Sequence, residues 1–553
     1  MNTPKQREIA TQLMQRFKAL QKRRELWEQI WQEVTELILP RLNDWSVTDQ
    51  GRPQKYGLKS FSGSAKSALR LASDGLQGYL VPRTSTWFRN QLKPTDLSDI
   101  PGARQWAQDV EEGMYTALNR SNFYDQIGEV FDTGLSIGTS TMFVREEIAK
   151  GALHFQARHP REIYISEDSY GNIDTWFRDY WISGKVLLEE FSSTIEDNPM
   201  ILEIIKHDPY KMHRCLHAVF PREERIWDKV DAQNKRYASI YMLHEQQLIL
   251  REGGFDRMPA ITWRYRVSSG EEYGTSPAID ALVDVIRENE VARTMMNARQ
   301  LAVEPPVVYT PNLRGKINLR PRGMIERVSP SDSVEMLNAL GQFPWGAEEE
   351  TILREAIRQH FNADFFLLLS QQQAQGRTAT EVMEMAGERA AVMGATVGRV
   401  ESELLDHVLG MVYEVESAAG RLPEPPEELV DAGEIDFDYV GPLAQLQKKH
   451  YGQRNILDTL QQAAPVMQIW EETRDQIDGD ALLREILDAG MFPAEAIRGE
   501  DEVAEMREAR AEMQQAMMQQ QQEAQAAAEY AQTNEAPQPG SPAEGLAERM
   551  PRP

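Results

Sequence analysis

The first stretch that suggests chemistry is GLSIG at residues 134–138, which matches G-x-S-x-G, the nucleophile elbow of α/β hydrolases. In that motif a strand turns sharply into a helix and lifts the serine above a sheet. Here the order is reversed, because a helical pattern, FYDQIGEVFDT, precedes the glycines and a strand pattern, TSTMFV, follows them. We therefore expect the glycines to end a helix at a tight turn. A serine hydrolase that uses Ser136 is the weaker interpretation.

A second candidate is the alternation of His213, Cys215 and His217, which places three potential zinc ligands on one face of a predicted strand. A structural zinc site takes a fourth ligand, and only His207 or Asp208 lies near in sequence. The alternation of buried and surface residues in a strand explains the pattern equally well. We predict no metal site and no cofactor.

The sequence also lacks the motifs of two other enzyme classes. It contains no G-x-x-x-x-G-K-[ST], and SGKV at residues 183–186 lacks both the upstream glycine and the final Ser or Thr. The dipeptide His244-Glu245 lacks the second histidine of H-E-x-x-H. We therefore predict a protein that is not an enzyme. If energy drives a transport step, another protein supplies the motor.

Charge is distributed unevenly along the 553 residues. The chain has 60 Lys and Arg against 86 Asp and Glu, a net charge of −26, which argues against wrapping DNA by neutralising its phosphates. Residues 1–100 hold 16 basic and 10 acidic side chains, so their net charge is +6 and the remainder carries −32. The two parts are expected to meet different partners. The single Cys215 excludes an internal disulfide and fits synthesis in a reducing cytoplasm, and no apolar run reaches the roughly 18 residues of a membrane span.

Strong local signals predict two long helices in the first 310 residues. Thr3 and Gln6 have the spacing of a capping box, with Pro4 at the first helical position. Apolar residues then recur at helical spacing until residue 40. Farther along, Ser276 is a good N-cap before Pro277, and the helix that follows can run for about 27 residues, or roughly 40 Å.

A third long helix is predicted over residues 378–420. Thr378 and Glu381 have capping-box spacing, and Gly420 followed by prolines marks the end. At roughly 60 Å this helix is longer than the roughly 30 Å depth of a compact domain. We therefore expect it to be a strut in an assembly of several copies.

The remaining patterns complete an α+β fold that is mainly helical. Strand patterns occupy about 139–180 and 212–268, with a helix over 185–207 between them, and a short strand over 434–440. Further helices are predicted over 64–80, 102–118, 122–133, 348–369, 443–491 (with breaks) and 501–532, followed by a flexible tail over 533–553.

Several stretches occur in an order that identifies a family. They are SFSG with ALRLASDGLQGYLVP and TWF, SNFYDQIGEVFDTGLSIGTSTMFV, HPREIYISEDSYGNIDTWFRDYW, HAVFPREE, EEYGTSP to EPPVV, GRTATEV, and GRVESELLDHVLGMVYEVESAAGRLPEPP. In this order the chain resembles the podovirus-type head-to-tail connecting protein, or portal protein, of tailed bacteriophages. The resemblance covers about residues 1–500, and the last fifty residues are generic in composition.

The resemblance implies a virion protein that forms a ring, usually of twelve copies, at one capsid vertex. Double-stranded DNA passes through the ring without sequence specificity during packaging and ejection, and the tail attaches to it. The implied partners are a terminase motor, the major capsid protein, a scaffolding protein and a tail adaptor. The implied parts are a wing at 1–184, 305–345 and 421–442, stem helices at 185–211 and 271–304, a clip at 212–270, channel-side helices at 346–420, a crown at 443–500 and a possible C-terminal barrel at 501–532.

In this family a tunnel loop between the channel-side helices projects toward the ring axis, and residues 370–377 occupy its place. Its expected DNA-facing side chains are Gln371, Gln372, Gln373, Gln375 and Arg377. Glutamines can hydrogen-bond water and touch phosphates without the strong electrostatic attraction of lysine. The arginine could form a weak phosphate-contacting girdle, or it could pair with Glu381 one turn on.

A negative channel would let DNA pass without adhering to its wall, because carboxylates repel the phosphate backbone. Asp280, Asp284 and Glu288 recur every four residues on one helix and are candidates for that lining. The alternative is that they form an ordinary solvated face. A third interpretation of the whole chain, beside the ring and the hydrolase, is an elongated coiled-coil scaffold without a channel.

Overall fold

The computed structural model describes residues 3–42, 45, 59–93, 102–147, 151–223, 229, 231–315, 317, 329–336, 344–370, 387–426, 429, 434–448, 479–480, 482–483 and 500–533. The chain divides into two units, Met1–Ile456 and Leu457–Pro553. The first unit combines helices with antiparallel sheets, which confirms the predicted mixture of helix and strand. The second unit contains the long helix α18 (Glu500–Thr533), which agrees with the helix predicted over 501–532.

Helix α1 (Pro4–Leu37) begins as the sequence predicts. The backbone N–H of Gln6 donates to Thr3 Oγ1 at 3.3 Å, and the N–H of Thr3 donates to Gln6 Oε1 at 2.9 Å, so the capping box is complete. Its apolar stripe, which includes Leu13 and Phe17, is buried against a five-stranded sheet. The helix stops at Leu37, three residues before a proline.

A three-stranded sheet of order β3-β2-β9 lies against helix α4 (Phe123–Ile137). Its strands are β2 (Thr139–Glu147), β3 (Ala152–Arg158) and β9 (Ala260–Arg264), and each neighbouring pair is antiparallel. Two further helices, α2 (Ser64–Leu80) and α3 (Ala103–Arg120), contribute to the same core. Helices α2 and α3 lie within two residues of the predicted ranges, and α4 continues to Ile137, beyond its predicted end at residue 133.

The second sheet has the order β4-β5-β6-β7-β8, with antiparallel neighbours throughout. Its strands are β4 (Ile163–Glu167), β5 (Ile173–Ser183), β6 (Met212–Pro221), β7 (Tyr237–Leu243) and β8 (Leu248–Phe255). The strands predicted over 212–268 therefore do not form a sheet of their own. Strand β6 lies between β5 and β7, and β9 pairs with β2 at the edge of the three-stranded sheet. The interior strands β5 and β2 are buried and thereby gain hydrogen-bond partners on both sides.

The single helix predicted over 185–207 is also wrong. The structure has three short helices there, namely α5 (Gly184–Glu190), α6 (Ser192–Glu196) and α7 (Pro199–His207). Pro199 at the first position of α7 has no N–H to continue a helix, and it disfavours helical geometry at Asn198 before it. The three helices pack against strands of the second sheet in a small apolar cluster of their own.

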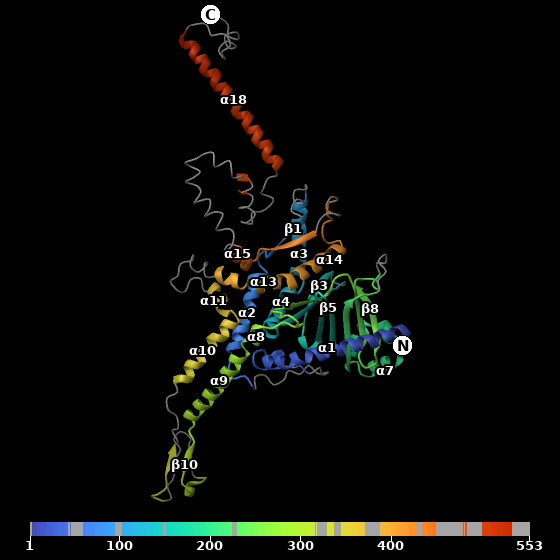
Figure 1. Ribbon diagram of the computed structural model, residues 1–553, viewed down its shortest axis with the longest axis vertical. Coiled ribbons are helices and arrows are strands. Elements are labelled where there is room, and N and C mark those ends of the chain that lie inside the picture. Colours follow the sequence, from blue (N-terminus) through green and yellow to red (C-terminus); the bar gives the residue numbers. More distant parts are fainter. Residues whose placement is uncertain are drawn as a thin grey trace. The chain divides into compact units, whose positions relative to one another are not determined.

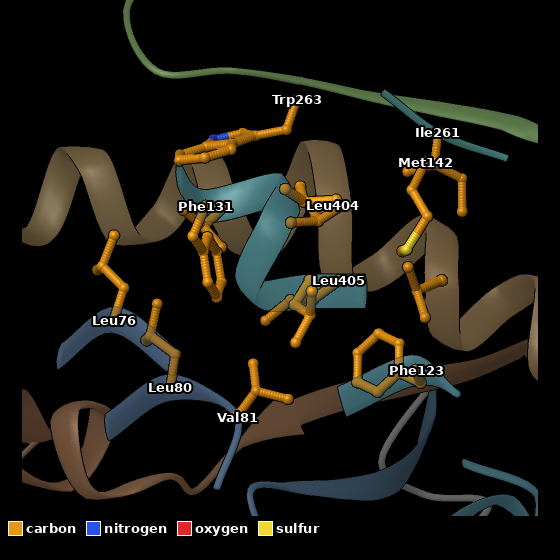
Figure 2. Packing of buried hydrophobic residues seen from close by; sticks show 14 of the residues in the cluster. Leu76, Leu80, Val81, Phe123, Phe131, Met142, Ile261, Trp263, Leu404 and Leu405 are labelled. Atoms are coloured by element: carbon orange, nitrogen blue, oxygen red, sulfur yellow. The ribbon is translucent and has the colours of Figure 1, made fainter. Parts of the chain in front are cut away.

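The main core lies where α2 and α4 meet the three-stranded sheet and the helix after residue 387 (Figure 2). Trp263 and Phe131 meet edge to face, with ring centroids 5.7 Å apart, and both are buried. Gly134 is required beneath the indole, because a Cβ there would overlap Trp263. Other members labelled in the figure are Leu76, Leu80, Val81, Phe123, Met142, Ile261, Leu404 and Leu405.

The helix predicted over 378–420 is described from residue 387 onward. It contains α13 (Gly394–Val400), a π-helical turn η5 (Glu401–Leu405) and α14 (Asp406–Ala418). It ends before Gly420, whose φ of +66° lies in the left-handed region, as the predicted C-terminus requires. The predicted start at residues 378–381 lies outside the described residues.

A pair of helices, α9 (Leu282–Val303) and α10 (Pro344–His360), extends away from the sheets of the first unit (Figure 1). Ser276 caps the short helix α8 (Pro277–Asp280) by accepting from the N–H of Ile279 at 3.0 Å, as predicted, and α9 follows after one residue. Beyond the far end of the pair, β10 (Val307–Tyr309) pairs with β11 (Val334–Met336). Helix α11 (Ala363–Ser370) follows α10.

Two elements close the first unit. Strand β12 (Glu434–Tyr439), predicted from its alternation, pairs with β1 (Phe88–Lys93), more than 300 residues earlier in the chain. Helix α15 (Pro442–Lys448) comes next. Most of the helical region predicted over 443–491, and the tail after residue 533, lie outside the described residues.

Candidate functional site

Ser136 lies in the last turn of α4, fully buried, and its hydroxyl donates to the carbonyl oxygens of Asp132 at 2.8 Å and Thr133 at 3.1 Å. The helix ends at Gly138, whose φ of +90° permits the turn into β2. The order is helix, turn, strand, the reverse of a nucleophile elbow. A buried hydroxyl committed to its own helix is not placed to attack a substrate, so the geometry argues against a hydrolase that uses Ser136.

His213, Cys215 and His217 do share one face of β6, but they do not converge. Alternate residues of a strand lie roughly 6.6 Å apart, so the first and last of the three are separated by about 13 Å. Cys215 is buried in the apolar cluster of α5–α7, and burial raises the pKa of its thiol to about 12. Within the described ranges no group of three His, Cys, Asp or Glu side chains is arranged to hold a metal ion.

The residues predicted to line a channel, Asp280, Asp284 and Glu288, lie along α8 and α9 and differ in their exposure to solvent. Asp280 is half-exposed and lies 3.8 Å from the guanidinium of Arg266. The Asp284 carboxylate lies 3.3 Å from Nε2 of His360 at the end of α10. Both contacts are near the surface, where ion pairs contribute little to stability, so these carboxylates are available to a solvent-filled space.

Glu288 is not available in this way, because its side chain is only 1% exposed. One carboxylate oxygen accepts from the Ser62 hydroxyl at 2.7 Å and from Nε of Arg354 on α10 at 3.2 Å. The other oxygen accepts from the Ser64 hydroxyl. The carboxylate therefore joins α9, α10 and the segment before α2 inside the subunit, rather than facing a channel.

Asn289 extends this junction. Its side-chain oxygen accepts from the N–H of Phe61 at 2.6 Å, and its amide group donates to the carbonyl of Lys59 at 2.8 Å. The guanidinium of Arg293, one turn on, lies 5.7 Å from the Phe61 ring. Residues 59–64, which contain the SFSG stretch, are thus held along the base of α9, and we call this contact the stem junction.

Sequence reasoning missed the stem junction, although two signals were present. SFSG stands out as a polar stretch just before a helix, and the adjacent Glu288 and Asn289 interrupt the apolar pattern of α9. Neither signal reveals its partner, because the two stretches are 226 residues apart. Residues 371–386, which include all five predicted tunnel-loop side chains, lie outside the described residues.

On both sides of the stem junction, α9 exposes apolar side chains. Val283, Leu301 and Val303 are 60%, 49% and 81% exposed, and Ile352 on α10 is 66% exposed. Among the described helices, none is both long enough and apolar enough to cross a membrane.

Comparison with known proteins identifies the relatives of this chain. Residues 10–497 match the family described as bacteriophage head to tail connecting protein. A probable portal protein of Bordetella phage BPP-1 is 24% identical over 510 residues, which cover 91% of each chain. The portal protein of Salmonella phage epsilon15 is 23% identical over 533 residues, which cover 94% of each chain.

Among solved structures, the chain matches one from the virion of a native gene transfer agent particle. The TM-score is 0.33, with 11% identity, and the match covers 73% of this chain and 84% of that one. The family match spans both sheets, the stem junction and the α9–α10 pair, and both phage relatives match along nearly their whole length. The chain belongs to the bacteriophage head-to-tail connecting protein family.

Proposed function

We propose that this chain is the portal subunit of a tailed phage, several copies of which form a ring at one capsid vertex. The ring admits double-stranded DNA during packaging, releases it during ejection and carries the tail. The observation that carries the proposal is the family match over residues 10–497, together with phage relatives of equal length that are named portal proteins. The exposed apolar side chains of α9 and α10 support it, because side-by-side copies would bury them.

In this proposal α9 and α10 form the stem, since they are the paired helices that leave the body together. The strands β10 and β11 beyond them then form the clip. The two sheets with α1–α4 form the wing. This division moves the stem partner of α9 from residues 185–211 to α10, and it moves the clip from 212–270 to the region around 305–345. The reason is that α5–α7 and β6–β8 belong to the second sheet and its helices, and β9 belongs to the three-stranded sheet. Residues 443–500 remain the proposed crown, and α18 the proposed barrel helix.

The channel wall is proposed to be acidic and weakly binding. Each copy adds a charge of −26, and Asp280 and Asp284 are the two members of the predicted lining that are not buried. Glu288 serves the stem junction instead. Gln371, Gln372, Gln373, Gln375 and Arg377 remain the proposed tunnel-loop residues that touch DNA without gripping it.

The proposed partners follow from the same assignment. A terminase motor would dock on the clip during packaging, and a tail adaptor would replace it afterwards. The major capsid protein and a scaffolding protein would contact the wing, where the basic first hundred residues lie. The ring acts in the virion at the head-tail vertex, after synthesis in the host cytoplasm, and performs no catalysis of its own.

The function is tested by removing this chain from the phage that encodes it. We expect heads that contain no DNA and carry no tails, with wild-type chain supplied in trans restoring both. Heads that fill with DNA and acquire tails in its absence would overturn the proposal.

The tunnel loop is tested by replacing Gln371, Gln372 and Gln373 with lysine. Packaging should slow, and slow more at low salt, because lysines attract the phosphates and salt screens that attraction. The matched control places lysine at Gln12, Gln15 and Gln21, which are exposed on α1. Packaging rates equal to wild type at every ionic strength would remove the loop from the DNA path.

A further inference from the structure

The helices α9 and α10 lie side by side and run antiparallel (Figure 1), and two contacts fix which of their residues lie at the same level. Nε of Arg354 on α10 lies 3.2 Å from the Glu288 carboxylate on α9. Farther from the body, Gly346 lies so close to Met295 that a Cβ on the glycine would come within 2.7 Å of the sulfur. Residue numbers therefore rise along α9 as they fall along α10.

Arg287 and Glu355 are the immediate neighbours of this contact, so they lie at the same level of the pair. An α-helix turns by about 100° per residue, so each of the two side chains is rotated by about 100° from the contact. Because the helices are antiparallel, these rotations turn the two side chains to opposite sides of the pair. Both side chains are exposed. One side of the pair therefore presents a cation and the other an anion at the same level.

Neither charge is compensated inside the subunit. Among the described residues, no oppositely charged side chain lies within ion-pair distance of Arg287 or Glu355. The adjacent Arg354 is already held by Glu288 and by Glu350 on its own helix. The charges that face into the pair are thus matched within it, whereas the cation and the anion on its two outer sides can be matched only by another molecule.

Each of these charges has an exposed apolar side chain one turn away on the same face of its helix. Val283 precedes Arg287 by four residues, and Ile352 precedes Glu355 by three, which are the spacings of neighbours on a helix surface. Both apolar side chains are more than half exposed. We call the surface of Val283 and Arg287 the α9 flank, and that of Ile352 and Glu355 the α10 flank. Each flank combines an uncompensated charge with uncovered apolar area, which is the composition of a protein contact surface.

The two flanks are complementary to each other, and this favours one occupant over the others. DNA would be attracted to Arg287 but repelled by the α10 flank, where Glu348 and Glu349 are exposed beside Glu355. A two-fold dimer through the α9 flank would leave the α10 flank uncovered, because such a dimer uses the same surface of both copies. A second copy in head-to-tail contact covers both flanks and matches both charges.

We propose that the α9 flank of each subunit docks on the α10 flank of its neighbour, with Arg287 of one copy paired to Glu355 of the next. This inference rests on the proposed ring. Rotation about an axis that runs along the stem keeps every copy at the same level and brings one side of each pair against the opposite side of the next. Arg287 and Glu355 share a level and lie on opposite sides, so this rotation brings them together.

The test exchanges the two charges in the full-length chain. Arg287→Glu and Glu355→Arg should each weaken association about 10-fold or more, because like charges then face each other across every contact. The double variant Arg287→Glu/Glu355→Arg should associate as the wild type does. Sedimentation velocity over a concentration series measures each variant. Arg7→Glu, at an exposed arginine of α1, is the matched control and should leave association unchanged.

Mixing the two single variants distinguishes a contact between copies from one within a copy. When the copies alternate in an equal mixture, every contact again joins opposite charges, so the mixture should regain wild-type association. A pair formed inside one copy would be restored by the double variant but not by mixing. Single variants that associate as tightly as the wild type, or a mixture that stays dissociated, would overturn the docking of the two flanks.

A cysteine variant tests the same contact without charge reversal. Arg287→Cys/Glu355→Cys is treated with a short bismaleimide, and the native Cys215 does not compete because it is buried. We expect a ladder of covalent multimers on a denaturing gel, since each copy is linked to the next on both sides, whereas either single cysteine variant should give monomers. Monomers alone from the double cysteine variant would overturn the docking of the flanks while leaving the ring intact. A wild-type chain that forms no ring would instead overturn the proposed function itself.

Discussion

The sheets and the α9–α10 pair differ in how much of their apolar surface the subunit itself buries. In the body, large side chains such as Trp263 and Phe131 are fully buried by the chain's own strands and helices. Along α9, Val283, Leu301 and Val303 remain largely exposed. The body buries its apolar side chains within a single subunit, whereas in the proposed ring the helix pair is covered by neighbouring copies. We therefore expect substitutions in the body to change the stability of the subunit, and substitutions in the helix pair to change the association of subunits.

The largest expected effect is in the body. Trp263→Ala should lower the free energy of unfolding by about 3–5 kcal/mol, because it leaves a cavity between α4 and the three-stranded sheet. Chemical denaturation measures the loss. The control Met200→Ala, at a side chain that is 80% exposed, should change stability by less than about 0.5 kcal/mol. Equal effects of the two substitutions would mean that the body is not packed as described.

The next effect is at the stem junction, which joins the two regions. Glu288→Ala should cost about 2–3 kcal/mol, because it leaves two serine hydroxyls and Arg354 without their buried acceptor. The control Glu290→Ala removes only an exposed contact of 3.7 Å with Arg293 and should cost less than about 0.5 kcal/mol. If Glu288→Ala is as stable as this control, the junction does not hold the helix pair to the body.

A smaller effect concerns the dependence of body stability on pH. The folded-state pKa of His217 lies well below the unfolded value of about 6.5, so the unfolded chain binds an extra proton at acidic pH. The stability that the neutral ring provides is present above about pH 6.5 and is lost as pH falls, by up to about 1.4 kcal/mol per pH unit. His217→Gln should flatten this slope, and the exposed control His207→Gln should not. A slope unchanged in His217→Gln would contradict burial of a neutral ring.

The smallest effect on the single subunit is expected along α9. Leu301→Ser should change the unfolding free energy of the dissociated chain by less than about 0.5 kcal/mol, because the side chain contacts no core. The same substitution should weaken association, since the apolar area is buried only between copies. Sedimentation velocity over a concentration series measures both states. A loss of subunit stability with normal association would reverse the assignment of the two regions.

Local features of this fold could be predicted from sequence, and contacts between distant segments could not. The capping box of Thr3, the N-cap of Ser276 and the end at Gly420 depend on neighbouring residues, and all three are confirmed. The pairing of β6 with β5 and of β9 with β2 depends on segments that no periodicity connects. Glu288 is an example. Its spacing from Asp280 and Asp284 predicts that all three carboxylates share one face, but Glu288 is buried in a contact with Ser62, 226 residues earlier.

The central claim, that the helix pair is completed only by neighbouring copies around an axis, is tested most directly by electron microscopy of the purified full-length chain. The account predicts class averages of a closed ring with a central hole, in which α9 and α10 of adjacent copies cover each other's exposed apolar side chains. Solitary compact particles without a hole, at every concentration and salt condition, would contradict it.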